Sequence, residues 1–382
     1  MLVLQSILIY GLIIWIMTYN AARVLRRKFL PVNFRQFITD KNIIFPILVF
    51  CFFAAIRWQV GVDCNGYIMG FYDRTEIASY IKKEWAFVYL QEFIRLISDS
   101  HIPFFFLLAF LQIFFVYYSF KDKPWILVFF ASMLFLCGAY WTWMNAVRQS
   151  IVCSIFIYVV SLLSKKKWLT SILWVIIASF FHRSALILLP ILVLFSYQKI
   201  IISNQALQLC IVIACYLLMG LNVTKSFTEI VDNALNIIGY DVGSQIHLIE
   251  TIMEKSFGLR SFLVLSANMI IILFVNKMKS YYNSPHFNIM YNLYYFGVCS
   301  SLIFYGNHGI ERFLMYFTCF TPIIMSSCAY YLYTHKNKLT NLLALIMLLI
   351  ILSVRTFYDF YIASGLEVEY TLYKSILFNN AY

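Results

Sequence analysis

Residues 125–163 read WILVFFASMLFLCGAYWTWMNAVRQSIVCSIFIYVVSLL and carry one formal charge, Arg148. A transmembrane helix needs about 20 apolar residues, so this stretch can hold two spans separated by a polar turn near Asn145. Of all 382 residues, 62% are hydrophobic and 12% are charged, whereas a soluble domain carries roughly 25% charged residues. Continuous apolar runs also differ from the alternating strands of a β-barrel. The sequence therefore predicts an all-α polytopic membrane protein.

Apolar runs near the spanning length recur about twelve times along the chain. They lie at 2–19, 42–56, 103–120, 125–143, 146–163, 168–181, 185–198, 206–221, 259–276, 289–305, 313–333 and 340–358. The first run has no basic start or small-residue cleavage site, which favours a retained span over a signal peptide. No Pro/Gly-rich linker interrupts the chain, so we expect one transmembrane domain over residues 1–382.

The basic residues predict the orientation, because cytoplasmic loops are enriched in Lys and Arg. One set of alternate loops holds sixteen cations and two acids, against thirteen cations and fifteen acids in the rest of the chain. These loops are 20–41, 121–124, 164–167, 199–205, 277–288 and 334–339. We expect these loops to be cytoplasmic and both termini to be outside. The dispersed charge does not indicate a nucleic-acid partner.

This topology predicts external segments at about 57–102 and 222–258, and an external tail at 359–382. Within the first of them, WAFVYLQEFIRLI (85–97) has apolar residues at helical spacing. We therefore expect an amphipathic helix on the outer surface.

Polar residues gather at span ends on the predicted outer side. Asn145, Arg148 and Gln149 have i, i+3, i+4 spacing and share one helix face. A charge costs roughly 2.5–3.5 kcal/mol at mid-bilayer, and its two polar neighbours favour a polar cavity over a snorkelling arginine. Three other stretches supply His182 and Arg183 in the tight 168–198 hairpin, His308, Glu311 and Arg312 before the eleventh run, and Arg57 and Asp63 in RWQVGVDCNGY (57–67).

Four arginines thus share one predicted depth at the outer leaflet, namely Arg57, Arg148, Arg183 and Arg312. A guanidinium binds phosphate through paired hydrogen bonds and stays charged, so a lipid phosphate is the ligand that this set favours. No P-loop, HExxH, GxSxG or CxxC pattern is present among 382 residues with nine cysteines. The sequence predicts no cofactor, no metal and no disulfide framework.

The same stretches resemble the EpsG and Wzy polysaccharide polymerases. RWQVGVDCNGY, which includes Tyr67, is similar to their Arg-x-x-x-Gly-x-Asp-x-x-x-Tyr pattern, and NAVRQ to their Asn-x-x-Arg-Gln helix start. FHRSAL resembles their Phe-His-x-Ser-Ala-Leu hairpin, and RFLMYF their Arg-x-x-x-Tyr-Phe element. Some relatives carry functional arginines in a loop like 222–258, which has none here before Arg260.

The resemblance implies a GT-C-like glycosyltransferase of the bacterial cytoplasmic (inner) membrane, with its active face periplasmic or extracellular. Its partners would be undecaprenyl-diphosphate-linked oligosaccharides, membrane lipid and a chain-length regulator. The growing O-antigen or related glycan would pass from undecaprenyl diphosphate to the non-reducing end of a new lipid-linked unit.

In such an enzyme Arg148 and Arg312 would hold the diphosphate, with Arg57 and Arg183 in support. His182 would be the general base and Asp63 the second candidate for that role. Supporting positions would be Asn145, Gln149, His308, Glu311 and Tyr67.

Three other functions fit parts of the pattern. A lipid-linked oligosaccharide flippase would need cations through the membrane depth, whereas these cluster at one face. An O-antigen ligase would use the same donor with a different acceptor. A membrane O-acetyltransferase would need polar catalytic residues facing the cytoplasm.

Overall fold

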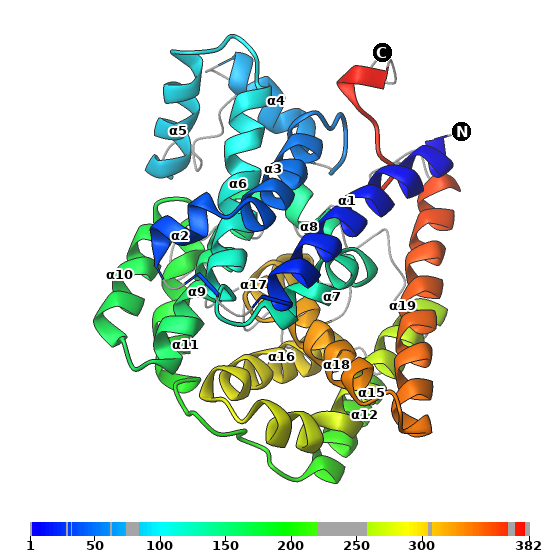
Figure 1. Ribbon diagram of the computed structural model, residues 1–382. Helices are drawn as coiled ribbons and strands as arrows, with labels where there is room; N and C mark the ends of the chain where they lie inside the picture. Colours follow the sequence, from blue (N-terminus) through cyan, green and yellow to red (C-terminus); the bar gives the residue numbers. More distant parts are fainter. Residues whose placement is uncertain are drawn as a thin grey trace.

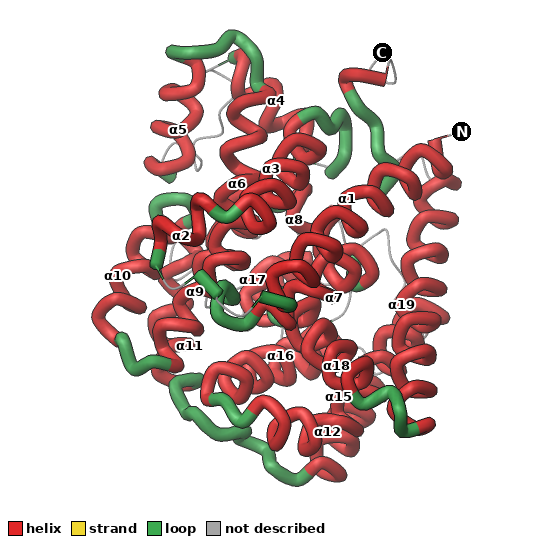
Figure 2. The backbone as a smooth tube through the Cα atoms, in the orientation of Figure 1, coloured by secondary structure: helices red, strands yellow, loops and turns green. Residues whose placement is uncertain are grey.

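A computed structural model gives the structure of the chain. It describes residues 2–27, 30–31, 33–61, 63–73, 84–219, 258–304, 308–365 and 371–378. Over these residues the chain consists of helices and loops (Figure 2), apart from one isolated bridge between Arg57 and Ser375. The all-α prediction is therefore confirmed for the described part of the chain.

Figure 1 shows the arrangement of the described helices. Their bounds are α1 Leu2–Leu25, α2 Phe34–Thr39, α3 Lys41–Ala55, α4 Cys64–Tyr72, α5 Trp85–Arg95, α6 Ile102–Ser119, α7 Pro124–Leu136, α8 Ala139–Asn145, α9 Val147–Ser164, α10 Trp168–Ser179, α11 Leu188–Leu194, α12 Gln205–Met219, α15 Leu259–Tyr282, α16 Pro285–Ile303, α17 His308–Thr318, α18 Thr321–Thr334 and α19 Leu339–Gly365, with short 3₁₀ helices η2 Arg183–Ile187 and η3 Ile376–Phe378.

Every apolar run expected from the sequence contains a helix or a broken pair of helices. Within the described residues, six helices are long and apolar enough to cross a membrane, and a seventh span results if α7 and α8 are counted together. The shorter apolar helices include α3, α10 and α12, each of 10–17 residues. The chain is thus a multi-pass membrane protein, whereas the number of twelve spans stays a prediction.

The run 125–143, expected as one span, is broken where α7 meets α8 at an angle of 71°. Gly138 lies between them with φ +74°, a backbone conformation that glycine adopts without steric cost. The break frees the carbonyl of Leu136, which accepts from Arg355 Nη1 at 3.4 Å and from Thr356 Oγ1 at 3.2 Å. Side chains of α19 therefore satisfy backbone that the bend exposes, as a membrane interior requires.

Helix α9 is the central helix of the bundle, and most of its residues are buried. It packs against α6, α10, α16 and α17. Arg148 is its second residue, so the first turn of α9 carries the charge into contact with the surrounding elements.

The tail expected outside the membrane begins within a helix, because α19 continues to Gly365. Residues 371–378 then lie beside the start of α1 (Figure 1). Tyr373 is fully buried, its backbone N–H donates to Ser6 Oγ at 2.7 Å, and its hydroxyl donates to the carbonyl of Phe53 at 2.8 Å. Residues 371–378 are consequently part of the packed structure.

The segment expected to be external at 222–258 lies outside the described residues as far as position 257. The amphipathic helix expected at 85–97 is present as α5, Trp85–Arg95, with Phe87, Gln91 and Ile94 buried.

Candidate functional site

The stretch RWQVGVDCNGY begins after α3 and its last four residues form the start of α4. Its Gly61 lies against the end of α8. Gly61 has φ +96°, and a Cβ added to it would lie 2.9 Å from the carbonyl oxygen of Met144. Only a glycine allows this close approach without strain. The contact brings the backbone N–H of Asp63 to 2.9 Å from the side-chain oxygen of Asn145, which accepts its hydrogen bond.

Glu84 is the centre of the site, although no local sequence pattern points to it. Its side chain is only 3% exposed, forms an ion pair with Arg148 and shares a hydrogen bond with His182. The Nδ1 atom of His182 lies 2.6 Å from one carboxylate oxygen, while a guanidinium nitrogen of Arg148 contacts the other. Three residues from distant parts of the chain thus share one buried carboxylate.

Two aromatic residues enclose Arg148 on its other sides. Its guanidinium lies 5.6 Å from the ring centroid of Phe87 on α5, a cation–π distance. It also donates a hydrogen bond to the hydroxyl of Tyr67 on α4, a residue expected to support the site. The Arg148 side chain is 11% exposed, so it is held by α4, α5 and the Glu84 carboxylate together.

Asp63 lies in the field of two arginines. Burial raises the pKa of its carboxyl above the ordinary value, while the charges of Arg312 and Arg148 oppose that shift. Asp63 therefore holds its proton more readily than an exposed aspartate. The same interactions place Arg312, which is exposed, within electrostatic reach of the loop that carries Asp63.

Side-chain contacts join the four sequence stretches that carry the family resemblance. Asp63 bonds to Asn145 across the first two stretches. The amide of Gln149 donates to the backbone carbonyl of Arg312, which links α9 to α17. Ser184 and Tyr316 share a hydroxyl hydrogen bond of 2.6 Å, which links the His182 hairpin to α17. The stretches therefore form one assembly.

Arg57 has a different environment from the other arginines. It is 2% exposed, donates to the carbonyls of Ala54 and Met144, and lies 4.7 Å from the ring centroid of Phe105. Its guanidinium is therefore buried inside the protein, where it joins the end of α3 to α8. Its expected contact with a diphosphate stays a prediction.

The remaining expected residues lie in η2 and in the first turn of α17. Arg183 begins η2 and is exposed, and Glu311 is partly buried in the first turn of α17. His308 begins α17, and its side chain lies outside the described part of the structure. Among the described residues, no group of three or more His, Cys, Asp or Glu side chains could hold a metal ion.

The geometry can support proton transfer. Because Glu84 engages Nδ1 of His182, the other ring nitrogen is left to accept or donate a proton. The His182 side chain is 18% exposed, so a substrate can reach it. A buried carboxylate that orients a histidine, with arginines beside it, is an arrangement that catalytic sites use.

Comparison with known proteins gives one match. The profile of the EpsG family matches residues 42–375, a range that includes all of the site residues named above. No curated protein and no solved structure shows significant similarity to the chain.

Proposed function

Because the chain belongs to the EpsG family, we propose that it is a membrane glycosyltransferase that polymerises lipid-linked oligosaccharide units. Family membership indicates a polysaccharide polymerase type of function. The finer proposal is a GT-C-like enzyme of about twelve spans in the bacterial cytoplasmic membrane. It uses undecaprenyl-diphosphate-linked units on the outer face and works beside a chain-length regulator.

The proposed reaction forms one glycosidic bond and breaks one sugar–phosphate bond. A hydroxyl oxygen at the non-reducing end of a new unit attacks the anomeric carbon of the growing chain. The bond from that carbon to the diphosphate oxygen breaks, and the lipid diphosphate leaves with the electron pair. The proton of the attacking hydroxyl passes to the free ring nitrogen of His182, and Glu84 stabilises the imidazolium that forms.

The contacts refine the roles expected of the arginines. Arg148 already pairs with Glu84, so its charge is largely balanced within the site. Arg312 and Arg183 are exposed and can meet the diphosphate, where a guanidinium stabilises the charge that develops on the leaving oxygen. Asp63 lies near Arg312 and is suited to orient the acceptor sugar.

The buried Glu84–His182 pair is the observation that carries this proposal. A transporter that moves a lipid diphosphate needs cations along its path, but it has no need of a histidine held by a buried carboxylate. Placing an acid 3% exposed between an arginine and a histidine costs desolvation free energy. A catalytic role for the histidine accounts for that cost.

A reconstituted polymerisation assay tests the proposal. The purified chain is mixed in detergent with an oligosaccharide on undecaprenyl diphosphate, and the products are resolved as a ladder on a gel. We expect a ladder from the wild type, none from His182→Gln, and a normal ladder from the control His335→Gln at the end of α18.

Three outcomes would contradict it. A wild-type ladder from His182→Gln would remove the proposed base. No ladder from the wild type, together with lipid movement across liposomes, would identify a flippase. Transfer of a single unit that requires a different acceptor would identify a ligase.

A further inference from the structure

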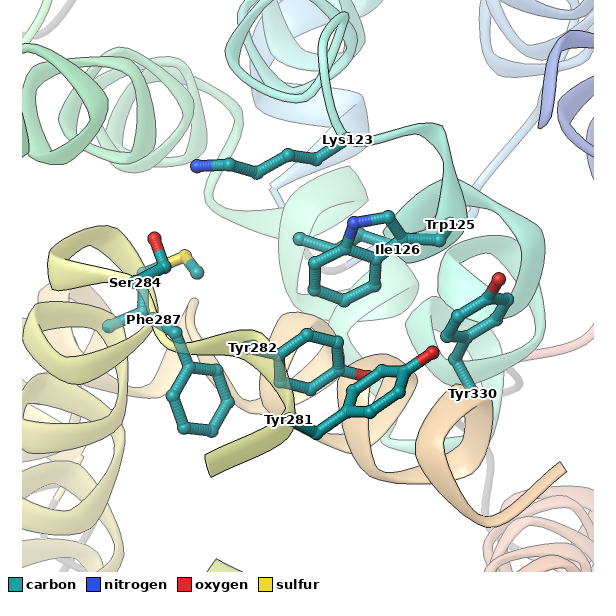
Figure 3. Close-up of a pocket in the computed structure, with 9 residues that line it drawn as sticks. Lys123, Trp125, Ile126, Tyr281, Tyr282, Ser284, Phe287 and Tyr330 are labelled. Carbon is teal, nitrogen blue, oxygen red and sulfur yellow. The ribbon is translucent and has the colours of Figure 1, made fainter. Parts of the chain in front are cut away.

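A cavity of about 430 Å³ opens between the start of α7, the turn joining α15 to α16, and α18 (Figure 3). It lies at the opposite end of α6 from the candidate site. Phe105, near the start of α6, contacts Arg57, whereas Lys123 on the cavity follows the end of α6 at Ser119. Helix α6 has 18 residues and is therefore roughly 27 Å long.

Aromatic side chains form a fixed wall of this cavity. The rings of Trp125 and Tyr282 stack with centroids 4.2 Å apart and an interplanar angle of 8°, and Tyr330 lies 5.7 Å from Trp125. The Tyr282 hydroxyl donates to the carbonyl of Ser327 at 2.6 Å, which holds the ring in place. The wall is therefore rigid and mostly apolar.

One cation lies on the cavity without an acidic neighbour in its lining. Lys123 Nζ lies 2.7 Å from Nδ1 of His286. An ammonium group can only donate, so this nitrogen accepts and the imidazole is neutral. Burial lowers the pKa of Lys123, Lys165 lowers it further, and Asp122 opposes them. No residue lining the cavity is acidic, so a bound anion would stabilise the ammonium form.

The lining of the cavity combines polar and apolar side chains. Lys123, Ser284 and the tyrosine hydroxyls are polar, whereas Ile126, Phe287 and Met290 are apolar. An amphiphile with an anionic head and a hydrocarbon tail matches both. The segments expected to be cytoplasmic also carry Lys121, Lys165, Lys166 and Lys167 in loops and Lys277 and Lys279 in the last turns of α15, and clusters of this type favour an acidic lipid surface.

We propose that this cavity binds an acidic phospholipid of the cytoplasmic leaflet, with its phosphate on Lys123 and the start of an acyl chain against Ile126 and Met290. The aromatic wall fits the lipid's glycerol region, where tyrosine and tryptophan rings are favoured. The site is separate from the catalytic cluster and does not depend on the function proposed for that cluster.

Native mass spectrometry of the full purified chain tests this proposal. The chain is released from nanodiscs that contain phosphatidylglycerol or phosphatidylcholine, and bound lipids are counted. A hydrogen bond to a charged group contributes about 1.5–3 kcal/mol, so Lys123→Gln should lower phosphatidylglycerol retention roughly tenfold or more. The control Lys338→Gln removes a lysine from another loop that we expect to be cytoplasmic, but this lysine does not line the cavity. It should retain phosphatidylglycerol as the wild type does.

A second variant keeps the charge and fills the space. Met290→Trp should lose the bound lipid although Lys123 is intact, while a single cooperative melting transition of both cavity variants shows that they fold. Equal retention of the two lipids by the wild type, or unchanged retention in Lys123→Gln and Met290→Trp, would overturn the proposal. Displacement of phosphatidylglycerol by millimolar inorganic phosphate would also overturn it, because the site would then select a free anion.

Discussion

Replacing Glu84 with alanine should cost both stability and activity. The carboxylate is 3% exposed and its partner Arg148 is 11% exposed, so the pair is a buried one. Removing one member leaves the other charge buried without compensation, which costs about 3–5 kcal/mol. We expect the apparent melting temperature of the detergent-solubilised chain, followed by tryptophan fluorescence, to fall by several degrees.

A matched control shows whether the effect is specific to the buried acid or follows from removing any acid in this part of the chain. Glu92 lies on α5 and pairs with Arg95, but its side chain is 33% exposed. Arg95 also donates to the carbonyls of Gly70 and Phe71 and so keeps hydrogen-bond partners without the acid. Glu92→Ala should therefore shift the melting temperature little and leave the polymer ladder unchanged.

The double variant Glu84→Leu, Arg148→Met separates stability from catalysis. Replacing both members of a buried ion pair by apolar residues of similar volume is often neutral for stability. The double variant should therefore regain most of the lost melting temperature. Its polymerisation should remain on the order of 10²–10⁴-fold slower, because His182 has lost its orienting carboxylate. If Glu84→Ala melted like the wild type, or if the double variant polymerised normally, the reasoning would be refuted.

Three further changes have defined outcomes. Gly61→Ala places a Cβ 2.9 Å from a backbone carbonyl at φ +96°. It should lower the free energy of unfolding by about 1–3 kcal/mol and slow polymerisation. The control Gly66→Ala, whose Cβ would have no atom within 4 Å, should change neither. Tyr373→Phe removes the hydroxyl that bonds to α3 at 2.8 Å and should cost about 1 kcal/mol, seen as a lower melting temperature. The raised pKa of Asp63 means that the folded chain binds this proton more tightly than the unfolded chain. Stability should thus fall as pH rises from the ordinary carboxyl pKa of about 3.9 through the raised value, and Asp63→Asn should flatten that part of the melting-temperature profile.

The sequence predicted the helices and part of the site because those features carry local signals. Arg148 is the only formal charge between Trp125 and Leu163, and an isolated charge in an apolar run indicates function. The i, i+3, i+4 spacing of Asn145, Arg148 and Gln149 predicted one shared helix face, which is wrong in detail, because α8 ends at Asn145 and α9 begins at Val147. Contacts of all three with other stretches are present in the structure.

Glu84 had no such signal. It follows Lys82 and Lys83 directly, a setting typical of a solvated surface segment. Its burial depends on Arg148 and His182, which lie 64 and 98 residues away. Pairing over such distances has no pattern in a single sequence. The one available argument is chemical, because a buried arginine and a buried histidine need an acidic partner.

The environment of Arg57 also depends on packing between segments that lie far apart in the sequence. Its position after an apolar run suggested a headgroup contact, and the run does end there, since α3 ends at Ala55. The carbonyls of Ala54 and Met144 and the ring of Phe105 use the guanidinium inside the protein. Whether an arginine at a span end faces lipid or protein depends on helix packing, which local sequence does not encode.

The contact between the last described segment and the end of α3 sets an order of assembly during synthesis. Tyr373 bonds to Phe53 across 320 residues of sequence, and Trp58 N–H donates to the carbonyl of Lys374 at 2.9 Å. At 5–20 residues per second, the ribosome needs roughly 16–64 s to bridge that interval. Throughout that time the loop bearing Asp63 lacks its final support, so a nascent chain cannot complete the candidate site before its membrane helices have been made.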